Sequence, residues 1–331
     1  MIINCPSRFD QGSAAQFVRT GLVPYLNYPD VTINFSNIGF IDPFSTLVLS
    51  YGLRGFLAHR KRKRLGLKFV GIDQNPGGVV SYLKHLGVFR HIGIDLGKNI
   101  DEASGSSDYL PLTRIRRDQI MWKGRAMQKE IDHKADRLAT VLFPHHSGAG
   151  PRYMLAYAIR EIIRNSFEHG LADHCIATAQ RLPNGKAEIA IADEGIGIFN
   201  SLRVTCQFST PEEALRGALR PGISSQSVTG DDEWANSGFG LYVVSELGRR
   251  YGIFEIMSDD HCLSIQGEHQ VIKDVSPLGT FVRLQIDTAD ADYFPNILTN
   301  IVSEGEKIAS QLPGAIKSAS KMSKLPMLFD I

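Results

Sequence analysis

The amino-acid sequence predicts a mixed α/β protein, with an N-terminal α/β domain followed by a larger domain in which helices cover a sheet. Its 331 residues are enough for about two domains of roughly 150 residues each. Strand and helix patterns alternate along the first 95 residues. With 43% apolar and 21% charged residues, the composition is that of an ordinary globular chain.

The charge balance and the cysteines exclude several classes of protein. The chain has 36 Lys and Arg residues against 35 Asp and Glu residues, so no overall field would hold nucleic acid or an anionic membrane. Its four cysteines are far apart and form no CxxC pair, which predicts reduced, buried thiols. The N-terminus lacks the features of a signal peptide, and no stretch is apolar enough to span a membrane. We therefore expect a cytoplasmic protein without a membrane or nucleic-acid partner.

Hydrophobic spacing predicts the elements of the first domain, which we assign to residues 1–95. Pro43 directly after Asp42 predicts a helix start, because proline suits the first turn and the carboxylate can accept hydrogen bonds from exposed amides. The expected strands cover residues 1–4, 31–35 and 67–72, and the expected helices cover residues 11–26, 42–64 and 78–86.

The basic run HRKRKR stands at residues 59–64, where the second of these helices ends. One interpretation is a patch for nucleic acid or an acidic partner. The other is a solvated helix end, where cations meet the negative end of the helix dipole. We favour the solvated helix end, because phosphate binding usually needs basic residues spread over a face.

Residues 96–125 are expected to link the two domains. Their first part is rich in Gly, Ser, Asp and Glu with little apolar periodicity, which indicates a loop, and a connecting strand follows at residues 109–116. The second domain is assigned to residues 126–288, beginning with a helix over residues 127–143. A helical tail then covers residues 289–331.

The helix expected over residues 152–170 carries an unusual polar face. Its apolar residues recur at helical spacing, and Glu161, Asn165 and His169 recur at every fourth position beside them. An acid, an amide and an imidazole therefore share one edge of the helix. Taken alone, this pattern is also typical of a solvated polar face.

Two glycine-containing segments follow this helix. Asp193 comes directly after a predicted strand and precedes Gly195 and Gly197, whereas Gly238 and Gly240 belong to the segment NSGFGL, which opens a helix. Glycines before a helix let backbone amides approach phosphate oxygens, and the helix dipole adds to the attraction. Neither segment is a dinucleotide-binding fingerprint, and the sequence contains no GxxxxGK[ST] motif.

These segments form an ordered series of motifs. The series is E-x-x-x-N-x-x-x-H on a helix, D-x-G-x-G after a strand, G-x-G-L before a helix, and Gly279 with Thr280 at the start of an alternating strand. It resembles the motifs of the GHKL ATPases, among them gyrase B, the heat-shock chaperone, histidine kinases and the MutL mismatch-repair proteins. The resemblance implies a Bergerat-type α/β sandwich that binds ATP and Mg²⁺.

The resemblance implies a role for each matching residue at the adenine end. Asp193 would accept a hydrogen bond from the adenine amino group, and Thr280 would assist through a water molecule. Gly195 and Gly197 would let the loop pack against the base.

At the phosphate end, the resemblance implies that Asn165 holds a Mg²⁺ ion bridging the phosphates. Glu161 would orient and deprotonate the attacking water, one helical turn from the metal ligand. His169 would either contact phosphate or close the end of its helix. The phosphates would be surrounded by the backbone of Gly238, Gly240 and Leu241.

Residues 201–235 lie where GHKL ATPases keep a mobile lid over ATP. Their Ser, Gly and Asp content favours mobility. Arg220, Ser224 and Ser225 are the residues that could touch phosphate in a closed lid, but we interpret them as solvated surface residues.

The pattern over about residues 28–90 resembles a STAS domain, the family of anti-sigma-factor antagonists. Those antagonists carry a phosphorylatable serine directly after an aspartate, whereas Pro43 follows Asp42 here. Proline cannot be phosphorylated, and the nearby Ser45 and Thr46 fit the first turn of a helix. We therefore interpret the N-terminal domain as a docking or dimerisation module.

The two resemblances together imply a Mg²⁺-dependent ATP-binding regulatory protein. We expect it to hydrolyse ATP slowly and to act as a nucleotide-dependent switch for protein partners, which would dock on the STAS-like domain or on the C-terminal tail. Two alternatives stay open: a serine/threonine or histidine protein kinase resembling anti-sigma-factor kinases, and an ATP-binding scaffold without turnover. In a histidine kinase, His133 would be the candidate phosphate acceptor, but Lys134 follows it where an acidic residue is usual.

The C-terminal tail and the oligomeric state also leave alternatives open. An amphipathic pattern around residues 295–309 predicts a helix. The tail is either folded back on the core or a partner-docking peptide. Homodimers are common among GHKL proteins, so a homodimer stays open.

Overall fold

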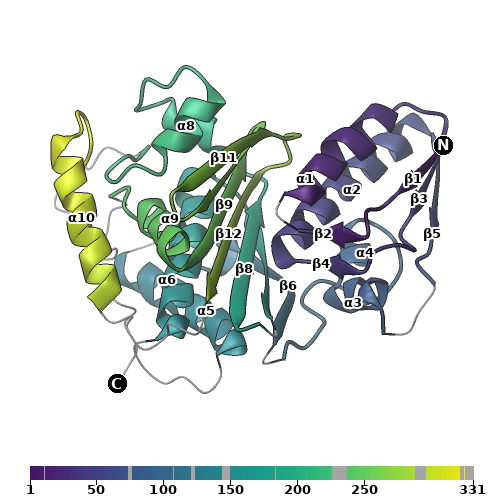
Figure 1. The fold of residues 1–331 in the computed structure, drawn as a ribbon, viewed down its shortest axis with the longest axis horizontal. Helices are drawn as coiled ribbons and strands as arrows, with labels where there is room; N and C mark the ends of the chain where they lie inside the picture. The colour runs from purple at the N-terminus through teal and green to yellow at the C-terminus, as the bar shows by residue number, and fades with distance from the viewer. Residues whose placement is uncertain are drawn as a thin grey trace.

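A seven-stranded antiparallel sheet forms the middle of the structure, and both of its faces are covered (Figure 1). Helices that follow residue 123 pack on one face, and an N-terminal α/β unit packs on the other. The computed structural model describes residues 1–10, 12–73, 77–106, 108–120, 124–143, 150–182, 184–225, 237–287, 296–320 and 324. The fold is thus mixed α/β, as expected.

The N-terminal unit contains a small parallel sheet of order β1-β3-β5 and a two-stranded pair, β2 with β4. The predicted strands and the helices from residues 42 and 78 are present, with ends shifted by a few residues. Its strands are β1 (Ile2–Asn4), β2 (Arg8–Phe9), β3 (Asp30–Asn34), β4 (Phe40–Ile41) and β5 (Gly66–Val70). Its helices are α1 (Ser13–Phe17), α2 (Pro43–Lys63), α3 (Val79–Leu86) and α4 (Val88–His91).

The helix expected over residues 11–26 is not one continuous α-helix. After α1 the chain forms a π-helix (Val18–Leu22) and then a 3₁₀ turn (Val23–Tyr25). Pro24 in that turn lacks the backbone N–H that a continuing helix requires, which ends the α-helical hydrogen bonding. Residue 11 lies outside the described residues.

Helix α2 begins as the Asp42–Pro43 pair predicts. The Asp42 carboxylate accepts a hydrogen bond from the Ser45 amide at 2.6 Å, and Pro43 occupies the first turn. Thr46 donates its hydroxyl to the Asp42 carbonyl at 2.8 Å, and both Ser45 and Thr46 are buried. The hydroxyls near Asp42 therefore belong to the interior of the structure.

Our interpretation of the basic run as a solvated helix end is wrong for Arg60. Its side chain is buried, and its guanidinium donates hydrogen bonds to backbone carbonyls of the loop before β3 and of β5. The distances to the Tyr25 and Tyr28 oxygens are 2.9 and 2.8 Å. Arg60 thus fastens the end of α2 to the small sheet, while residues 61–64 are exposed.

The large sheet has the order β11-β10-β9-β12-β8-β7-β6, and every neighbouring pair is antiparallel. The strand predicted as a connection at residues 109–116 is its edge strand β6. Sequence reasoning did not predict β7, β9, β10 or β11. The strands are β6 (Tyr109–Arg116), β7 (His174–Arg181), β8 (Lys186–Asp193), β9 (Gly252–Ser258), β10 (His261–Gln266), β11 (His269–Asp274) and β12 (Thr280–Asp287).

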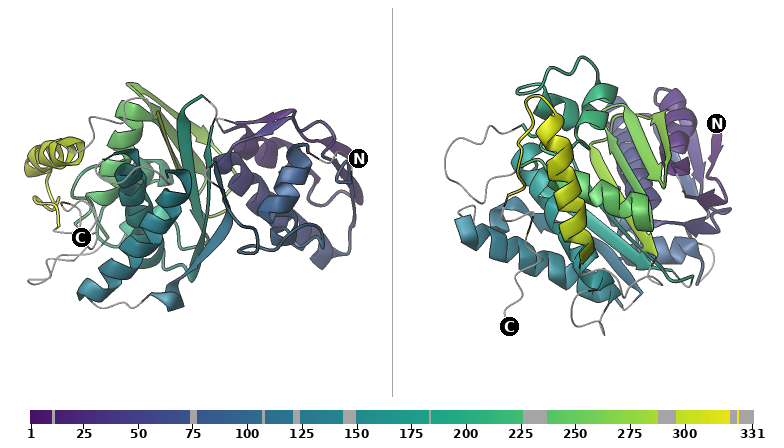
Figure 2. Two further views of the ribbon diagram at one scale, coloured as in Figure 1. Left: turned by 90° about the horizontal axis from the view of Figure 1, so that it is seen from below. Right: turned by 60° about the vertical axis from the view of Figure 1, so that its left-hand side comes forward.

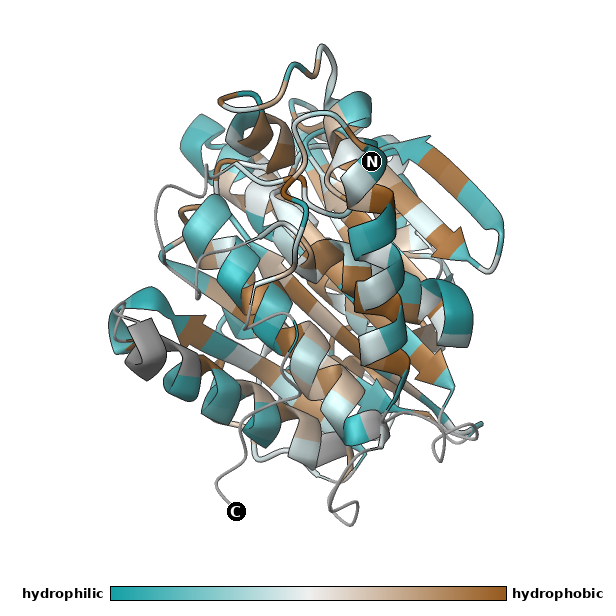
Figure 3. Cartoon of the chain, turned by 90° about the vertical axis from the view of Figure 1, so that its left-hand side faces the viewer, coloured by the Kyte–Doolittle hydropathy of each residue, from teal (hydrophilic) through white to brown (hydrophobic). Residues whose placement is uncertain are grey.

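Helices α5 (Gly124–Leu142), α6 (Pro151–Arg164) and α9 (Gly240–Tyr251) cover one face of this sheet (Figure 2). The last described helix, α10 (Ile297–Gln311), packs outside α9. Coloured by hydropathy, these helices are mostly hydrophilic on their outer side, and the strands behind them carry hydrophobic residues (Figure 3). Residues 297–320 are therefore folded back on the core, which is one of the two alternatives for the tail.

Two further expectations concern the thiols and the membrane. All four cysteines are free thiols; Cys5, Cys175 and Cys262 are buried, and Cys206 is half-buried. None of the helices in the described ranges has an apolar stretch long enough to cross a bilayer.

The other face of the large sheet is covered by the N-terminal unit. Helix α2 contacts β7, β8 and β12, and apolar residues of both parts form one hydrophobic core. Tyr51 on α2, for example, packs edge-on against Phe281 on β12, with ring centroids 5.1 Å apart. The two predicted domains thus share a buried interface.

A buried ionic cluster lies in the middle of that interface. The Arg283 guanidinium bonds Glu188 at 2.8 Å and Glu255 at 2.5 Å, and it lies 3.6 Å from Asp42 at the start of α2. Glu188 also accepts hydrogen bonds from the Phe44 amide at 3.1 Å and from Gln285. All of these side chains are buried. Burial, together with the nearby Asp42 carboxylate, raises the pKa of Glu188 to about 7 in spite of the Arg283 guanidinium beside it.

We predict that Arg283→Met lowers the free energy of unfolding by about 3–5 kcal/mol, because it leaves three buried carboxylates without a counter-ion. Urea denaturation at pH 7.5 measures the loss. The control is Arg216→Gln, which removes an exposed ion pair with Glu212 and is expected to cost less than about 1 kcal/mol. Equal losses in the two variants would contradict the role assigned to Arg283.

Candidate functional site

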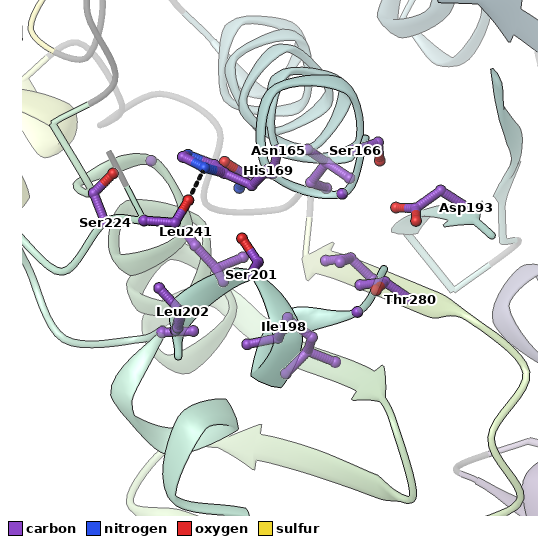
Figure 4. Close-up of a pocket in the computed structure, with 18 of the residues that line it drawn as sticks. Asn165, Ser166, His169, Asp193, Ile198, Ser201, Leu202, Ser224, Leu241 and Thr280 are labelled. Atoms are coloured by element: carbon purple, nitrogen blue, oxygen red, sulfur yellow. Dashed lines mark hydrogen bonds between the residues drawn. The ribbon is translucent and has the colours of Figure 1, made fainter. Parts of the chain in front are cut away.

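A pocket lies on the helix-covered side of the large sheet, between the end of α6, the loop after β8, the start of α9 and the first residue of β12. Asp193 and Thr280 lie at one end of it, and His169 and Ser224 lie at the other (Figure 4). The enclosed space is 90 Å³. The pocket brings together these residues singled out from the sequence: Asn165, His169, Asp193, Gly197, Gly238, Gly240, Leu241 and Thr280.

The polar residues of this helix reach the pocket where the α-helix changes into a π-helix. We expected one continuous helix over residues 152–170, but α6 ends at Arg164 and a π-helix, η4 (Asn165–His169), follows. In it, the Gly170 amide donates to the Asn165 carbonyl, five residues earlier, at 2.8 Å. Single π-turns within helices are frequent at functional sites. The wider turn lets Asn165, Ser166 and His169 all line the pocket.

Asp193 supplies a buried carboxylate at the end of β8, with 4% of its surface exposed. Its Oδ1 accepts a hydrogen bond from the Gly195 amide at 2.8 Å, and the Ser166 side chain provides another. Burial raises the pKa of Asp193 to about 6 in spite of these two hydrogen bonds. Sequence reasoning missed Ser166, although a hydroxyl residue next to Asn165 on a helix is a signal that could have indicated it.

Thr280 reaches the pocket from the neighbouring strand. It is directly opposite Asp193 in the register of β12 with β8, so the two residues share one end of the pocket. Its hydroxyl lies 3.3 Å from that of Ser258, which also accepts a hydrogen bond from the Ile198 amide at 3.0 Å. These bonds hold the loop after β8 against the ends of β9 and β12.

The pocket glycines are required by backbone packing. Gly238 has a φ of 71°, and a Cβ there would lie 2.3 Å from the Ile223 carbonyl oxygen. A Cβ on Gly240 would lie 2.2 Å from Oε2 of Glu161. Gly195 does not line the pocket. A Cβ on Gly195 would lie 2.2 Å from the Gly170 carbonyl oxygen.

Glu161 is not among the residues that line the pocket. Its carboxylate is buried, and Oε1 accepts hydrogen bonds from Arg160 at 3.0 Å. Arg160 in turn lies 3.6 Å from Asp132. The other oxygen, Oε2, lies beside Gly240 in the first turn of α9. The carboxylate therefore lies next to Gly240, which does line the pocket.

Residues 201–225 of the expected lid are ordered around short helices, α7 (Ile198–Leu202) and α8 (Pro211–Gly217). Ser224 and Ser225 line the pocket, and the Ser225 hydroxyl lies 2.6 Å from Nδ1 of His169. Our interpretation of these two serines as solvated surface residues is therefore wrong, whereas Arg220 does not line the pocket. Residues 226–236, which include the rest of the expected lid, lie outside the described residues.

The C-terminal tail contacts the chain on both sides of that segment. The Ile316 amide donates to the Gly222 carbonyl at 2.9 Å, and the Ser320 amide donates to the Ser237 hydroxyl at 2.8 Å. Gly222 itself donates to the Gly238 carbonyl at 3.2 Å. The tail thus touches residues at the edge of the pocket.

The chain matches no known protein-family model, no curated protein and no solved structure.

We predict that Gly238→Ala lowers the free energy of unfolding by about 1–3 kcal/mol, because alanine is strained at this positive φ and its Cβ would contact a carbonyl oxygen. Gly55→Ala is the matched control, since Gly55 lies exposed within α2 with no atom near the added methyl group. There we expect stabilisation of about 0.5–1 kcal/mol. Thermal and urea unfolding measure both effects, and a neutral Gly238→Ala would show that the backbone around Gly238 yields easily.

Proposed function

We propose that this pocket binds ATP with Mg²⁺ and that the protein is a GHKL-type regulatory ATPase. One observation carries the proposal: four motifs spread over residues 161–280 contribute side chains or glycines to the pocket or to the helix turn directly behind it. A solvated polar helix face would not explain this convergence, because Asn165 and His169 line a pocket opposite a buried carboxylate from another element.

The pocket offers two chemically different ends for a nucleotide. The ionised Asp193 carboxylate is an acceptor suited to the adenine amino group, with Thr280 beside it. At the other end, Asn165 and His169 face the glycine-containing turn that begins α9. The N-terminus of α9 is a favourable position for phosphate. Apolar side chains between the ends suit the faces of a purine: Ile198, Leu202, Ile223 and Leu241.

The space enclosed here, 90 Å³, is well below the roughly 300–1,000 Å³ of pockets that hold such ligands. Ser224 and Ser225 close one end of it, and Ser225 is hydrogen-bonded to His169. Nucleotide binding therefore requires this segment to move away from His169. This requirement fits the lid expected at residues 201–235.

Mg²⁺ would be held by the Asn165 side-chain oxygen together with phosphate oxygens. Among the described residues, no group of three or more His, Cys, Asp or Glu side chains could hold a metal ion. Mg²⁺ commonly binds through one or two protein ligands plus substrate phosphates. The bound ion would neutralise phosphate charge, and its binding would depend on the nucleotide.

Glu161 is the proposed general base for hydrolysis. Its Oε2 lies beside Gly240, at the end of the pocket assigned to phosphate, and Arg160 orients the carboxylate through Oε1. A serine/threonine or histidine kinase would use the same base on a protein hydroxyl or imidazole. The candidate acceptor His133 lies exposed on α5. Ser45 and Thr46 are buried against the large sheet, so partners of the N-terminal unit would use another part of its surface.

We predict that Glu161→Gln lowers ATP turnover by at least about 100-fold and changes ATP affinity little, because it removes the base and leaves the phosphate contacts. The assay follows free phosphate and protein-bound label from γ-labelled ATP with Mg²⁺. Free phosphate in the wild type supports an ATPase, whereas protein-bound label supports a kinase. Undiminished turnover in Glu161→Gln would refute the assignment of the base.

The matched control is Glu168→Gln, which makes the same change beside Arg164 on the next turn, at a residue that does not line the pocket. It should retain wild-type turnover. Asn165→Ala should remove the Mg²⁺-dependent part of nucleotide affinity, and thermal unfolding of all three variants shows that they fold.

We predict that the affinity for the adenine base falls as the pH is lowered through about 6, because the protonated Asp193 no longer offers an ionised acceptor. Above pH 7 the affinity should be constant. Calorimetry with adenosine between pH 5 and 8 measures this affinity. Adenosine carries no phosphate group, so no phosphate of the ligand titrates in this range. Asp193→Asn, which cannot ionise, should bind more weakly with a flat pH profile, and the same slope in both proteins would disprove the role of Asp193.

A further inference from the structure

Basic side chains gather where the N-terminal unit meets the edge of the large sheet. Two surface grooves open there, with volumes of 550 and 530 Å³. The first is lined by Arg114, Arg116, Arg117, Asp118, Asp173 and His174, and the second includes Arg54, Lys61 and His91. Four residues of the two grooves are neighbours, since Arg54, Arg114 and His174 all lie near His91. We refer to them as the basic seam: Arg54 on α2, His91 on α4, Arg114 on β6 and His174 on β7.

The register of β6 with β7 aligns the sheet half of the basic seam. Arg116 is directly opposite His174, and Arg114 is opposite Ile176. Side chains alternate along a strand, so these residues share the sheet face on which Ile176 packs into the core of the N-terminal unit. The two arginines and His174 therefore continue that face beyond the edge of the apolar core.

Two nitrogen atoms of the basic seam are buried without a hydrogen-bond partner in the described part of the chain. They are Nε of Arg114 and Nε2 of His91, which come from the two halves of the molecule. The His91 side chain is 9% exposed and lines the second groove. Buried polar atoms are almost always satisfied, so two at one junction indicate a place for a bound group.

Positive charge at the basic seam is only partly compensated. Arg54 forms an ion pair with Glu194, whereas no ion pair of Arg114 is found within the described ranges. Asp118 and Asp173 also line the first groove, and Asp173 and Glu194 lie close enough to His174 to oppose part of the positive charge. Burial and the nearby Arg54, Arg114 and His174 together lower the pKa of His91 to about 3. Burial and Arg114 also lower the pKa of His174.

We propose that the basic seam binds a phosphoryl group. Its three oxygens could accept hydrogen bonds from several donors of the basic seam, whereas a carboxylate has only two oxygens to offer. Arginine forms strong charge-assisted bonds to phosphate oxygens, and the two grooves leave room for whatever carries the group.

This site is distinct from the proposed nucleotide pocket, and the inference does not depend on it. Asp193 lines the pocket, whereas the next residue, Glu194, bonds Arg54 of the basic seam. Adjacent residues at the end of one strand thus serve opposite faces of the sheet. A phosphoryl group beside Arg54 would compete with Glu194 for its guanidinium.

The test is NMR of the full chain with ¹³C-labelled histidine, titrated with inorganic phosphate at constant ionic strength set by chloride. We expect the resonances of His91 and His174 to shift and saturate with a dissociation constant of about 1 mM or below. The pKa of His91 should rise, because a bound anion favours the imidazolium. Unchanged His91 and His174 resonances up to about 50 mM phosphate would overturn the proposal.

Variants assign the binding to named side chains. Arg114→Gln should weaken phosphate binding at least about tenfold, and Arg116→Gln, at an exposed position where folding is not at risk, should weaken it less. The matched control is Arg137→Gln, an exposed arginine on α5, which should bind as the wild type does. Wild-type affinity in both Arg114→Gln and Arg116→Gln would overturn the proposal.

Two further measurements separate the sources of the phosphoryl group and the two sites. A blocked phosphoserine that binds about tenfold tighter than inorganic phosphate indicates a phosphorylated protein segment, and equal affinities indicate a free phosphate compound. The His169 resonance reports the nucleotide pocket in the same spectra. A shift of His169 with ATP but not with phosphate tests the proposed function separately.

Discussion

The structure depends on one buried arginine. Arg283 lies in the middle of the large sheet and joins carboxylates of β8 and β9 to Asp42, the residue that caps α2. This interaction fixes the start of α2 against the sheet. Tyr51 and Arg54, further along α2, are then held against Phe281 and Glu194, close to the loop that carries Asp193. The N-terminal unit therefore supports the pocket from the opposite face of the large sheet.

The pocket itself is built largely from close backbone contacts. Gly195 packs on the Gly170 carbonyl, Gly238 on the Ile223 carbonyl and Gly240 on the Glu161 carboxylate. The sequence predicts that these glycines make space for a ligand. In the structure, they allow protein segments to approach one another. The same contacts hold Asp193 and Glu161 in fixed positions without a nucleotide, which reduces the ordering that binding would require.

The sequence was informative where a local rule determines the structure. Asp42 and Pro43 predict the start of α2, and the motifs contain many of the residues that line the pocket, although Glu161 and Gly195 do not line it. It was uninformative where partners come from distant parts of the chain. Nothing local distinguishes Arg60, whose acceptors lie in another loop and strand, from its exposed neighbours. The π-turn at Asn165 and the role of Ser166 likewise depend on how α6 meets the end of β8, which spacing alone does not encode.

The contacts of the tail give the end of the chain influence over the pocket. Ile316 donates to the carbonyl of Gly222, next to Ile223 of the pocket, and Ser320 donates to the hydroxyl of Ser237, next to Gly238 of the pocket. A movement of the pocket at Gly222 or Gly238 and a release of the tail would therefore be coupled. Under the proposed function, anything that binds residues 312–320 would by reciprocity change nucleotide affinity by the same factor by which nucleotide changes its binding. Residues far from the pocket in the sequence would thus influence the site.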